Sequence, residues 1–341
     1  MKILITVDPE IPVPPKLYGG IERVVHQLGQ GYQSLGHEVI LLAHPESNST
    51  NFHQRHAWPA LKSRGTRNIY TNAKKLRHVV KSEQPDLIHS FSRIAYLPFI
   101  WEFKGAIIQT FQRKISNTTT RLAKNFFGER LHLTACGRHM FQSLSKPEHW
   151  SAVPNCCDTE FLTQPTTTGR THLAFLGRIE PIKGILEAIK FAQSVQTPLV
   201  IAGNIEPEWE SFFENEVKPH IDGTLIQYIG TVDDIAKRNL LSGAIGFLML
   251  IQWEEPFGIV MAEALACGAP VIALNRGSVP EIVEHGINGI VGDSIASLIQ
   301  TYPLVDKISE QVCRMDAVNR FSIDAVASLY LKILTSDDAL K

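Results

Sequence analysis

The stretch AIGFLMLIQWEEPFGIVMAEALACGAPVIAL, residues 244–274, contains two apolar runs separated by a longer helical pattern. The runs at 244–250 and 270–274 have the length of buried strands, and residues 258–268 between them predict a helix. Two strands joined through a helix favour a parallel pair with the helix on one face of the sheet. This stretch therefore predicts an α/β fold.

Two glutamates stand out in the same stretch. Glu263 lies inside the apolar helix, and an ionised carboxylate is costly to bury unless it is paired or hydrogen-bonded. Glu263 therefore needs a partner from the protein or from a ligand, and its two oxygens suit the two neighbouring hydroxyls of a ribose. Glu255 precedes Pro256, which favours an extended residue before it, so Glu255 is expected in a loop where it could contact a sugar.

The rest of the chain repeats the same alternation of strand and helix. Strand patterns such as KILITV, HEVILLA, DLIHSF, HLAFLG and PLVIAG are separated by helical patterns, and a Pro- and Thr-rich linker interrupts them near residues 152–171. We therefore expect two doubly wound domains, residues 1–160 and 161–320, and a final helix over 321–337 that packs back on the first. Ligands of open α/β sheets bind at the carboxyl ends of the strands, so the expected site is the cleft between the domains.

Composition is that of an ordinary soluble globular protein, with 44% hydrophobic and 20% charged residues among 341. No apolar run reaches the roughly 18 residues of a membrane span, and the start does not have the pattern of a signal peptide. The five cysteines form no C-x-x-C pair, which favours reduced thiols in a cytoplasmic protein.

Charge is distributed unevenly along the chain. Residues 1–150 contain 20 Lys+Arg against 10 Asp+Glu, whereas the remainder is acidic. The basic half could meet an anionic partner such as a phospholipid surface or a phosphorylated acceptor, or could be a solvated face that attracts the acidic half. No nucleic-acid partner is expected, because no recognition helix or aromatic platform is evident.

Two loops have features that suit phosphate binding. Gly19 and Gly20 open the first helix, where backbone N–H groups are free, although neither G-x-G-x-x-G nor a P-loop motif is present. Arg178 and Lys183 flank the loop FLGRIEPIKG after the first strand of the second domain. Two fixed cations at that edge of the sheet could neutralise a diphosphate.

At this point the residues resemble a known family. EPFGIVMAE resembles the E-x7-E motif of glycosyltransferase family 4, whose members are retaining nucleotide-sugar transferases of the GT-B fold. The resemblance extends along nearly the whole chain, through GGIERVVHQLGQGYQSLGHEVILLA, VPNCCDTEFL, FLGRIEPIKG and GAPVIALNRGSVPEIVEHGINGIVGD. It implies two Rossmann-like domains facing a central cleft, the first for the acceptor and the second for the donor, with the C-terminal helix packed back on the first.

The resemblance also implies residue roles. Arg178 and Lys183 would stabilise the leaving diphosphate, Glu255 would contact the donor sugar, and Glu263 would hold the ribose, its partner absent until the donor arrives. The remaining donor-site residues would be Gly19, Gly20, Gly177, Thr231, Val232, Phe257, Gly258, Ile259 and Val260. No D-x-D is present, since Asp233 and Asp234 are adjacent, which fits an enzyme that needs neither a metal nor another cofactor.

The candidate acceptor site involves two positions that differ from the family pattern, and a basic stretch of the first domain could contact a membrane. Many relatives have histidines where this chain has Phe91 and Gln112, so His89, Phe91 and Gln112 are the candidate acceptor- or sugar-site residues, with a structural role as the alternative for His89. The basic stretch 51–81, with Phe52, Trp58 and Tyr70, is a candidate for peripheral contact with the inner face of a membrane, or else an acceptor-side loop and a solvated helix.

The substrates are predicted only by class. The donor is expected to be a nucleotide-sugar, with UDP as its nucleotide because that base is commonest in the family. The acceptor is a hydroxyl on a sugar, a lipid-linked molecule or a small molecule. The alternatives are a nucleotide-sugar epimerase on the same fold and a non-catalytic nucleotide-sugar-binding protein.

Overall fold

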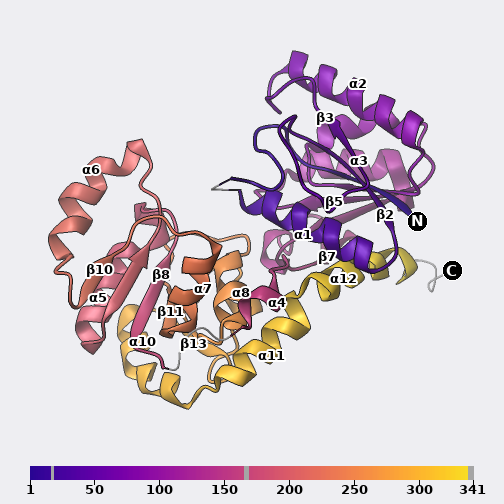
Figure 1. Cartoon of the computed structure of the whole chain (residues 1–341). Coiled ribbons are helices and arrows are strands. Elements are labelled where there is room, and N and C mark those ends of the chain that lie inside the picture. Colours follow the sequence, from indigo (N-terminus) through magenta and orange to yellow (C-terminus); the bar gives the residue numbers. More distant parts are fainter. Residues whose placement is uncertain (17–18, 165–168, 337–341) are drawn as a thin grey trace. The chain divides into compact units, whose positions relative to one another are not determined.

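The computed structural model describes residues 1–16, 19–164 and 169–336 (Figure 1). It divides into two compact units, each built on its own parallel sheet. The first comprises Met1–Cys157 and the helix that begins at Ile323, and the second is Asp158–Ser322. The sequence-based boundaries at 160 and 320 lie within three residues of these limits.

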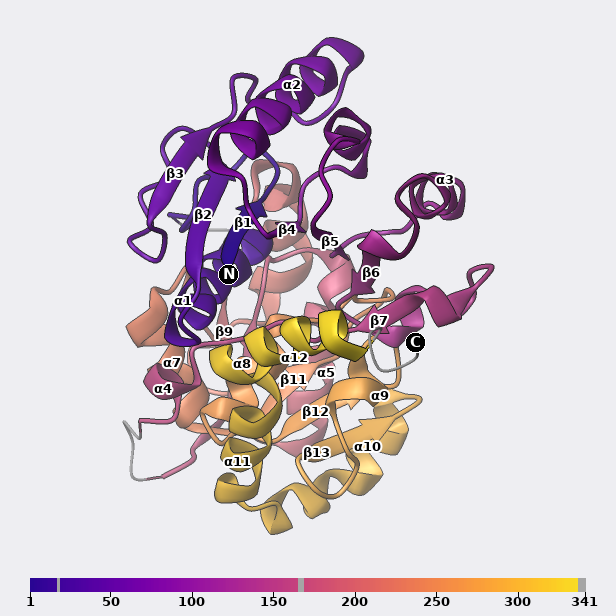
Figure 2. The ribbon, with the colours of Figure 1, turned by 90° about the vertical axis from the view of Figure 1, so that its right-hand side faces the viewer.

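The sheet of the first unit has seven parallel strands in the order β3-β2-β1-β4-β5-β6-β7, seen edge to edge in Figure 2. Their bounds are β1 Lys2–Thr6, β2 Glu38–Ala43, β3 Gln54–Ala57, β4 Leu87–Ser90, β5 Ala106–Phe111, β6 Leu131–Ala135 and β7 Trp150–Ala152. In register, Ile3 of β1 lies opposite Val39 on one side and Leu87 on the other. The strand order reverses between β1 and β4, which is where ligands of such sheets bind.

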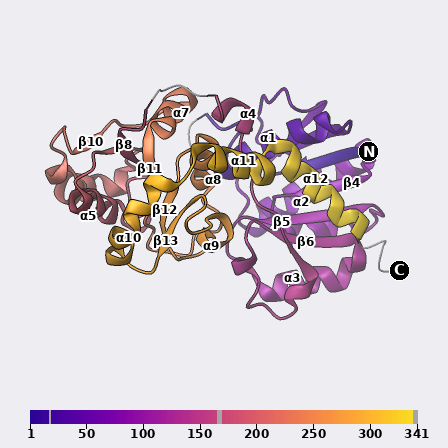
Figure 3. The same cartoon turned by 90° about the horizontal axis from the view of Figure 1, so that it is seen from below.

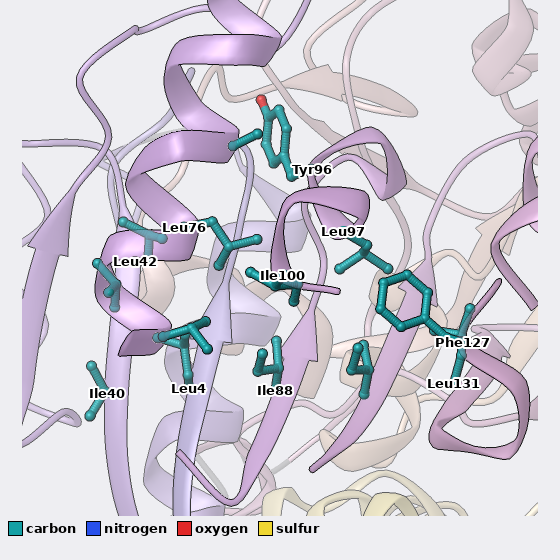
Figure 4. Close-up of a cluster of buried hydrophobic side chains, with 14 of the residues drawn as sticks. Leu4, Ile40, Leu42, Leu76, Ile88, Tyr96, Leu97, Ile100, Phe127 and Leu131 are labelled. Atoms are coloured by element: carbon teal, nitrogen blue, oxygen red, sulfur yellow. The ribbon is translucent and has the colours of Figure 1, made fainter. Parts of the chain in front are cut away.

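Alternate side chains of these strands face two different layers of helices. One face packs on α2 Thr66–Glu83, the 3-10 helix η1 Ile94–Ile100 and α3 Asn117–Phe127. Figure 4 shows this cluster, which includes Leu4, Ile40, Leu42, Leu76, Ile88, Tyr96, Leu97, Ile100, Phe127 and Leu131. Successive side chains point to opposite faces of the sheet, and the central strands are buried on both faces.

The opposite face is covered by α1 Gly20–Ser34 and α12 Ile323–Ser336. The two helices pack on each other, and α12 runs alongside the sheet of the first unit in Figure 3. Tyr330 of α12 and Tyr32 of α1 both contact His89 of β4. The prediction that the last helix packs back on the first domain is confirmed.

The second unit repeats the same topology with six parallel strands, ordered β10-β9-β8-β11-β12-β13. Their bounds are β8 His172–Leu176, β9 Leu199–Ala202, β10 Ile226–Tyr228, β11 Ala244–Met249, β12 Val271–Leu274 and β13 Gly289–Gly292. The order reverses between β8 and β11, so the loops that follow these two strands occupy the position where a ligand is expected. Two doubly wound sheets of this kind confirm the predicted α/β class.

Helices of the second unit are α4 Thr159–Leu162, α5 Ile185–Val195, α6 Glu210–Phe212, α7 Asp234–Ser242, α8 Ile259–Ala266, α9 Val279–Ile282, α10 Ile295–Thr301 and α11 Glu310–Phe321. Helix α8 is buried on nearly all sides, which explains its apolar composition. Residues 207–220 are helical throughout but change type, from a 3-10 turn at Pro207–Trp209 to α6, a π turn at Phe213–Val217 and a 3-10 turn at Lys218–His220. Pro219, which has no N–H to donate, lies in the last of these turns.

The basic stretch 51–81 does not form an aromatic surface. Phe52 and Trp58 are buried, and the indole of Trp58 donates to the carbonyl of Val7 at 2.7 Å, so only Tyr70 of the three aromatic side chains is exposed. The prediction of an aromatic-bearing membrane face is therefore wrong for Phe52 and Trp58. Among the helices of the described residues, none has the length and apolar character needed to cross a bilayer.

Candidate active site

The loops after β8 and β11 meet at the carboxyl edge of the second sheet. Lys183, from the first loop, places its Nζ 2.7 Å from Oε2 of Glu255, from the second. Both side chains are largely buried, and 72 residues separate them in the sequence. The structure thus brings together a predicted phosphate ligand and the predicted sugar ligand at the point where the strand order reverses.

Gly184 explains why the first loop can lie so close to β11. Its φ of +75° is in the left-handed region, and a Cβ there would overlap the carbonyl oxygen of Leu250. Next to it, the N–H of Gln252 donates to the carbonyl of Ile182 at 2.8 Å. Glycine at position 184 therefore allows backbone packing that fixes Lys183.

Arg178 has a carboxylate beside it as well. Its Nη2 lies 2.8 Å from Oε1 of Glu180, which is buried. Each predicted phosphate-binding cation is thus matched by one carboxylate, Glu180 for Arg178 and Glu255 for Lys183. Sequence reasoning missed Glu180, although an acidic residue between two apolar ones in FLGRIEPIKG could have drawn attention to it.

The backbone of Glu255 is fixed by the loop after β12. The N–H of Ser278 donates to the carbonyl of Glu255 at 3.1 Å, and the Ser278 hydroxyl donates to the carbonyl of Phe257 at 2.6 Å. A carboxylate oxygen of Glu254 accepts from the N–H of Gly277 at 2.7 Å. Glu254 therefore ties the two loops together.

The buried carboxylate of Glu263 has its partner within the protein. Lys237 of α7 donates to Glu263 Oε1 at 2.5 Å and also lies 3.1 Å from Asp234. The expectation that this partner is absent until the donor arrives is wrong. Sequence reasoning missed Lys237 because the contact joins two helices 26 residues apart and no local pattern marks it.

The other predicted donor residues of this unit lie at the same edge of the sheet. Gly177 follows β8, Thr231 and Val232 follow β10, and residues 257–260 lead into α8. Phe257 is buried against Phe321, and Gly258 caps α8, so the helix begins at Ile259 and Val260, which are half-buried. The N–H of Met261 donates to the carbonyl of Gly258 at 2.9 Å, so Ile259 and Val260 are the first-turn residues whose N–H groups can bind an anion or a sugar oxygen.

In the first unit, Gly19 and Gly20 lie at the start of α1. Gly19 is the N-cap residue and is buried, whereas Gly20 is exposed and begins the helix. Their position follows β1, at the place where the strand order of that sheet reverses. The phosphate-binding role of Gly19 and Gly20 stays a prediction, based on the N–H groups that a helix start leaves free.

His89 belongs to the interior of the first unit. It is fully buried, its Nδ1 lies 2.9 Å from the Tyr32 hydroxyl, and its Nε2 lies 2.8 Å from the Thr110 hydroxyl. Burial lowers the pKa of His89 to about 3, so the ring is neutral. Phe91 is also buried and stacks near it. The prediction that His89 and Phe91 line an acceptor site is therefore wrong, since both contribute to packing.

Gln112 is held by a reciprocal amide pair. Its side-chain nitrogen donates to Asn155 Oδ1 at 2.5 Å, and the Asn155 amide donates back to Gln112 Oε1 at 2.9 Å. Gln112 remains half-buried, so it is the one member of the predicted acceptor set that reaches the surface. The pair also ties β5 to the segment that ends the first unit.

Sequence reasoning missed an acidic group beside β1. Asp8 accepts a hydrogen bond from the N–H of Arg93 at 3.1 Å and lies 4.0 Å from Nη1 of Arg113. Burial, with a smaller contribution from Glu10, raises the pKa of Asp8 to about 6. This side chain at the carboxyl edge of the first sheet can therefore exchange a proton near neutral pH.

The adjacent aspartates that fail to make a D-x-D have structural roles. Asp233 caps α7 by accepting from the N–H of Ala236 at 2.8 Å, and Asp234 lies beside Lys237. Within residues 1–16, 19–164 and 169–336, no three His, Cys, Asp or Glu side chains are grouped as metal ligands. All five cysteines are buried.

Comparisons with known proteins find family matches in both units. Residues 160–299 match the family model described as Glycosyl transferases group 1, and residues 18–161 match Glycosyltransferase Family 4. The N-acetyl-alpha-D-glucosaminyl L-malate synthase of Bacillus anthracis is 27% identical over 138 residues, which is 39% of this chain and 35% of that protein. The glycogen synthase of Mycobacterium tuberculosis is 24% identical over 349 residues, covering 81% of this chain and 79% of that protein.

The match to the malate synthase thus spans about a third of that relative's length. Among solved structures, the Anabaena protein HepE in complex with UDP superposes with a TM-score of 0.75 at 18% identity, over 98% of this chain and 100% of that one. That likeness shows a shared fold. Because the two family matches together extend from residue 18 to residue 299, the chain belongs to the group 1, family 4 glycosyltransferases and has their GT-B fold.

Proposed function

We propose that this chain transfers a sugar from a nucleotide-sugar, with UDP as the nucleotide, to a hydroxyl acceptor, with retention of configuration and without a metal ion. The observation that supports this most directly is the 2.7 Å contact between Lys183 and Glu255. It joins the phosphate loop to the sugar loop at one edge of the donor unit. Arg178 extends from the same phosphate loop, and Glu263 lies on the helix that follows the sugar loop.

Arg178 and Lys183 would stabilise the diphosphate as it leaves. The bond from the anomeric carbon to the phosphate oxygen breaks, negative charge grows on that oxygen, and fixed cations there lower the barrier. A guanidinium and an ammonium supply the charge that a divalent cation provides in other transferases. For this reason we propose that the transfer needs no metal ion.

Retention follows if the acceptor hydroxyl attacks from the face that the diphosphate leaves. The new bond forms between the hydroxyl oxygen and the anomeric carbon, and the hydroxyl proton passes to the departing phosphate oxygen. Glu255 and Glu263 each form an ion pair with a lysine. This arrangement fits a role as hydrogen-bond acceptors better than a role as general acid and general base. The paired-carboxylate mechanism of glycosidases is therefore not proposed.

Glu263 would hold the ribose. Lys237 occupies Oε1, so Oε2 is the oxygen that accepts from the ribose hydroxyls, and the ion pair sets its direction in advance. Glu255 would accept from hydroxyls of the donor sugar. UDP is supported by the shared fold with HepE, whose structure contains UDP.

A thermal-shift panel tests the donor site. UDP-glucose, GDP-mannose and ADP-glucose are added to the wild type and to Glu263→Ala, and at least one should raise the melting temperature of the wild type more than that of the variant. A panel with no such difference would remove the donor-site assignment. Detection of glycosyl transfer to an acceptor, in the presence of EDTA, separates the proposal from a nucleotide-sugar epimerase and from a metal-dependent transferase.

A further inference from the structure

The loop that carries Glu255 also carries an aromatic side chain in contact with the same carboxylate. The indole Nε1 of Trp253 donates to Glu255 Oε2 at 2.9 Å, and Lys183 Nζ donates to that same oxygen at 2.7 Å. Lys183 Nζ also lies 5.1 Å from the centroid of the Trp253 ring. Two side chains thus donate to one carboxylate oxygen of Glu255, and Trp253 itself is 36% exposed, so it is not part of the core.

A bound diphosphate would change this arrangement. Its phosphates bring more negative charge to Lys183 than the single carboxylate does, so the ammonium turns toward them. Glu255 then loses its cation and faces an anion of like charge, which repels it. A neutral hydrogen-bond donor to Oε2, such as the indole N–H of Trp253, can hold the carboxylate in place, because it carries no charge for the phosphates to attract.

We propose that Trp253 is the positioning residue for the donor sugar. Its indole N–H keeps Glu255 directed at the sugar hydroxyls after the diphosphate has drawn Lys183 away. In the empty state the face of the same ring keeps Lys183 close to the carboxylate through a cation–π contact. The inference rests on the proposed function, and it divides the site into a diphosphate part at Lys183 and a sugar part at Glu255 and Trp253.

Calorimetric titration of the full chain separates these parts. UDP-glucose, GDP-mannose and ADP-glucose, each paired with its nucleoside diphosphate, are titrated into the wild type, Trp253→Phe, Glu255→Gln and the double variant. Trp253→Phe keeps an aromatic ring, although a smaller one, beside Lys183 and removes the indole N–H. Its affinity for the nucleoside diphosphate should stay within about twofold of wild type, and its affinity for the nucleotide-sugar should fall about tenfold. In the Glu255→Gln background the same change should add less than about twofold.

Trp101→Phe is the matched control, because Trp101 is also exposed but lies in the first unit, and all affinities should stay unchanged. The inference would be overturned if Trp253→Phe lowered the affinities for nucleoside diphosphate and nucleotide-sugar equally. It would also be overturned if the fold-loss in affinity of the double variant equalled the product of the two single fold-losses. A wild type that binds none of the three pairs would overturn the proposed function instead.

Discussion

Lys237→Met removes the cation from the buried ion pair of Glu263. The Nζ–Oε1 distance is 2.5 Å, and the two side chains are only 12% and 6% exposed. Removing one partner of a buried pair costs about 3–5 kcal/mol, because an uncompensated charge remains. Asp234, which is half exposed, adds little to the pair. Because both side chains keep some contact with solvent, we expect a value at the lower end of this range, a loss of about 3 kcal/mol in the free energy of unfolding of the second unit.

Hydrogen exchange in the full chain measures this loss where it occurs. Peptides that contain α8 should exchange faster by the factor that corresponds to this free energy, roughly a hundredfold. Lys218→Met is the matched control, because Lys218 and Glu214 lie 2.6 Å apart but are 58% and 49% exposed. That variant should lose less than about 0.5 kcal/mol.

The double variant Lys237→Met/Glu263→Gln tests the reason for the loss. Replacing both charges leaves no buried charge unpaired, so much of the stability should return. If Lys237→Met alone exchanges as slowly as Lys218→Met, burial of the Glu263 pair does not stabilise α8, and the reasoning fails.

Three further outcomes are expected. Because the pKa of His89 is about 3 in the folded chain, the unfolded chain binds a proton below about pH 6.5 and the folded chain does not. The free energy of unfolding should therefore fall by about 1.4 kcal/mol per pH unit from pH 6.5 toward pH 3. His89→Leu should flatten this slope in denaturant titrations. Gly184→Ala should destabilise by at least about 2 kcal/mol more than Gly223→Ala in thermal melts, because both have positive φ but only Gly184 faces a backbone oxygen. Arg178→Ala and Lys183→Ala should each lower turnover more than about tenfold in a glycosyl-transfer assay, and near-wild-type rates would refute their role at the leaving group.

Much of the fold follows from local pattern. Strands such as β1 and β11 are continuous apolar runs bounded by turn residues, and the 244–274 stretch specifies a strand, a loop and a helix by itself. The short strands β3, β7 and β13 have no counterpart among the strand patterns predicted from the sequence. β3 lies at the edge of the sheet with a polar, largely exposed sequence, and β7 has only three residues, so their pairing depends on the neighbouring strand.

The candidate site divides in the same way. Arg178, Lys183 and Glu255 could be named from the sequence because each lies in a loop directly after a strand, and strand ends in a parallel sheet converge at one edge. Whether a side chain there is accessible is a different matter. His89 also ends a strand, yet its side chain points to the face covered by α1 and α12 and is fully buried.

Local spacing along the chain is enough to predict the two-domain α/β architecture, the family and the types of residue in the candidate donor site. How each charge in that site is balanced depends on contacts that form only in the folded chain. Glu263 is held by Lys237, Arg178 by Glu180, and Glu255 by Lys183 and Trp253. Glu263 and Lys237, like Glu255 and Lys183, lie on separate elements. Burial, which makes each pairing matter energetically, is a property of the folded chain alone.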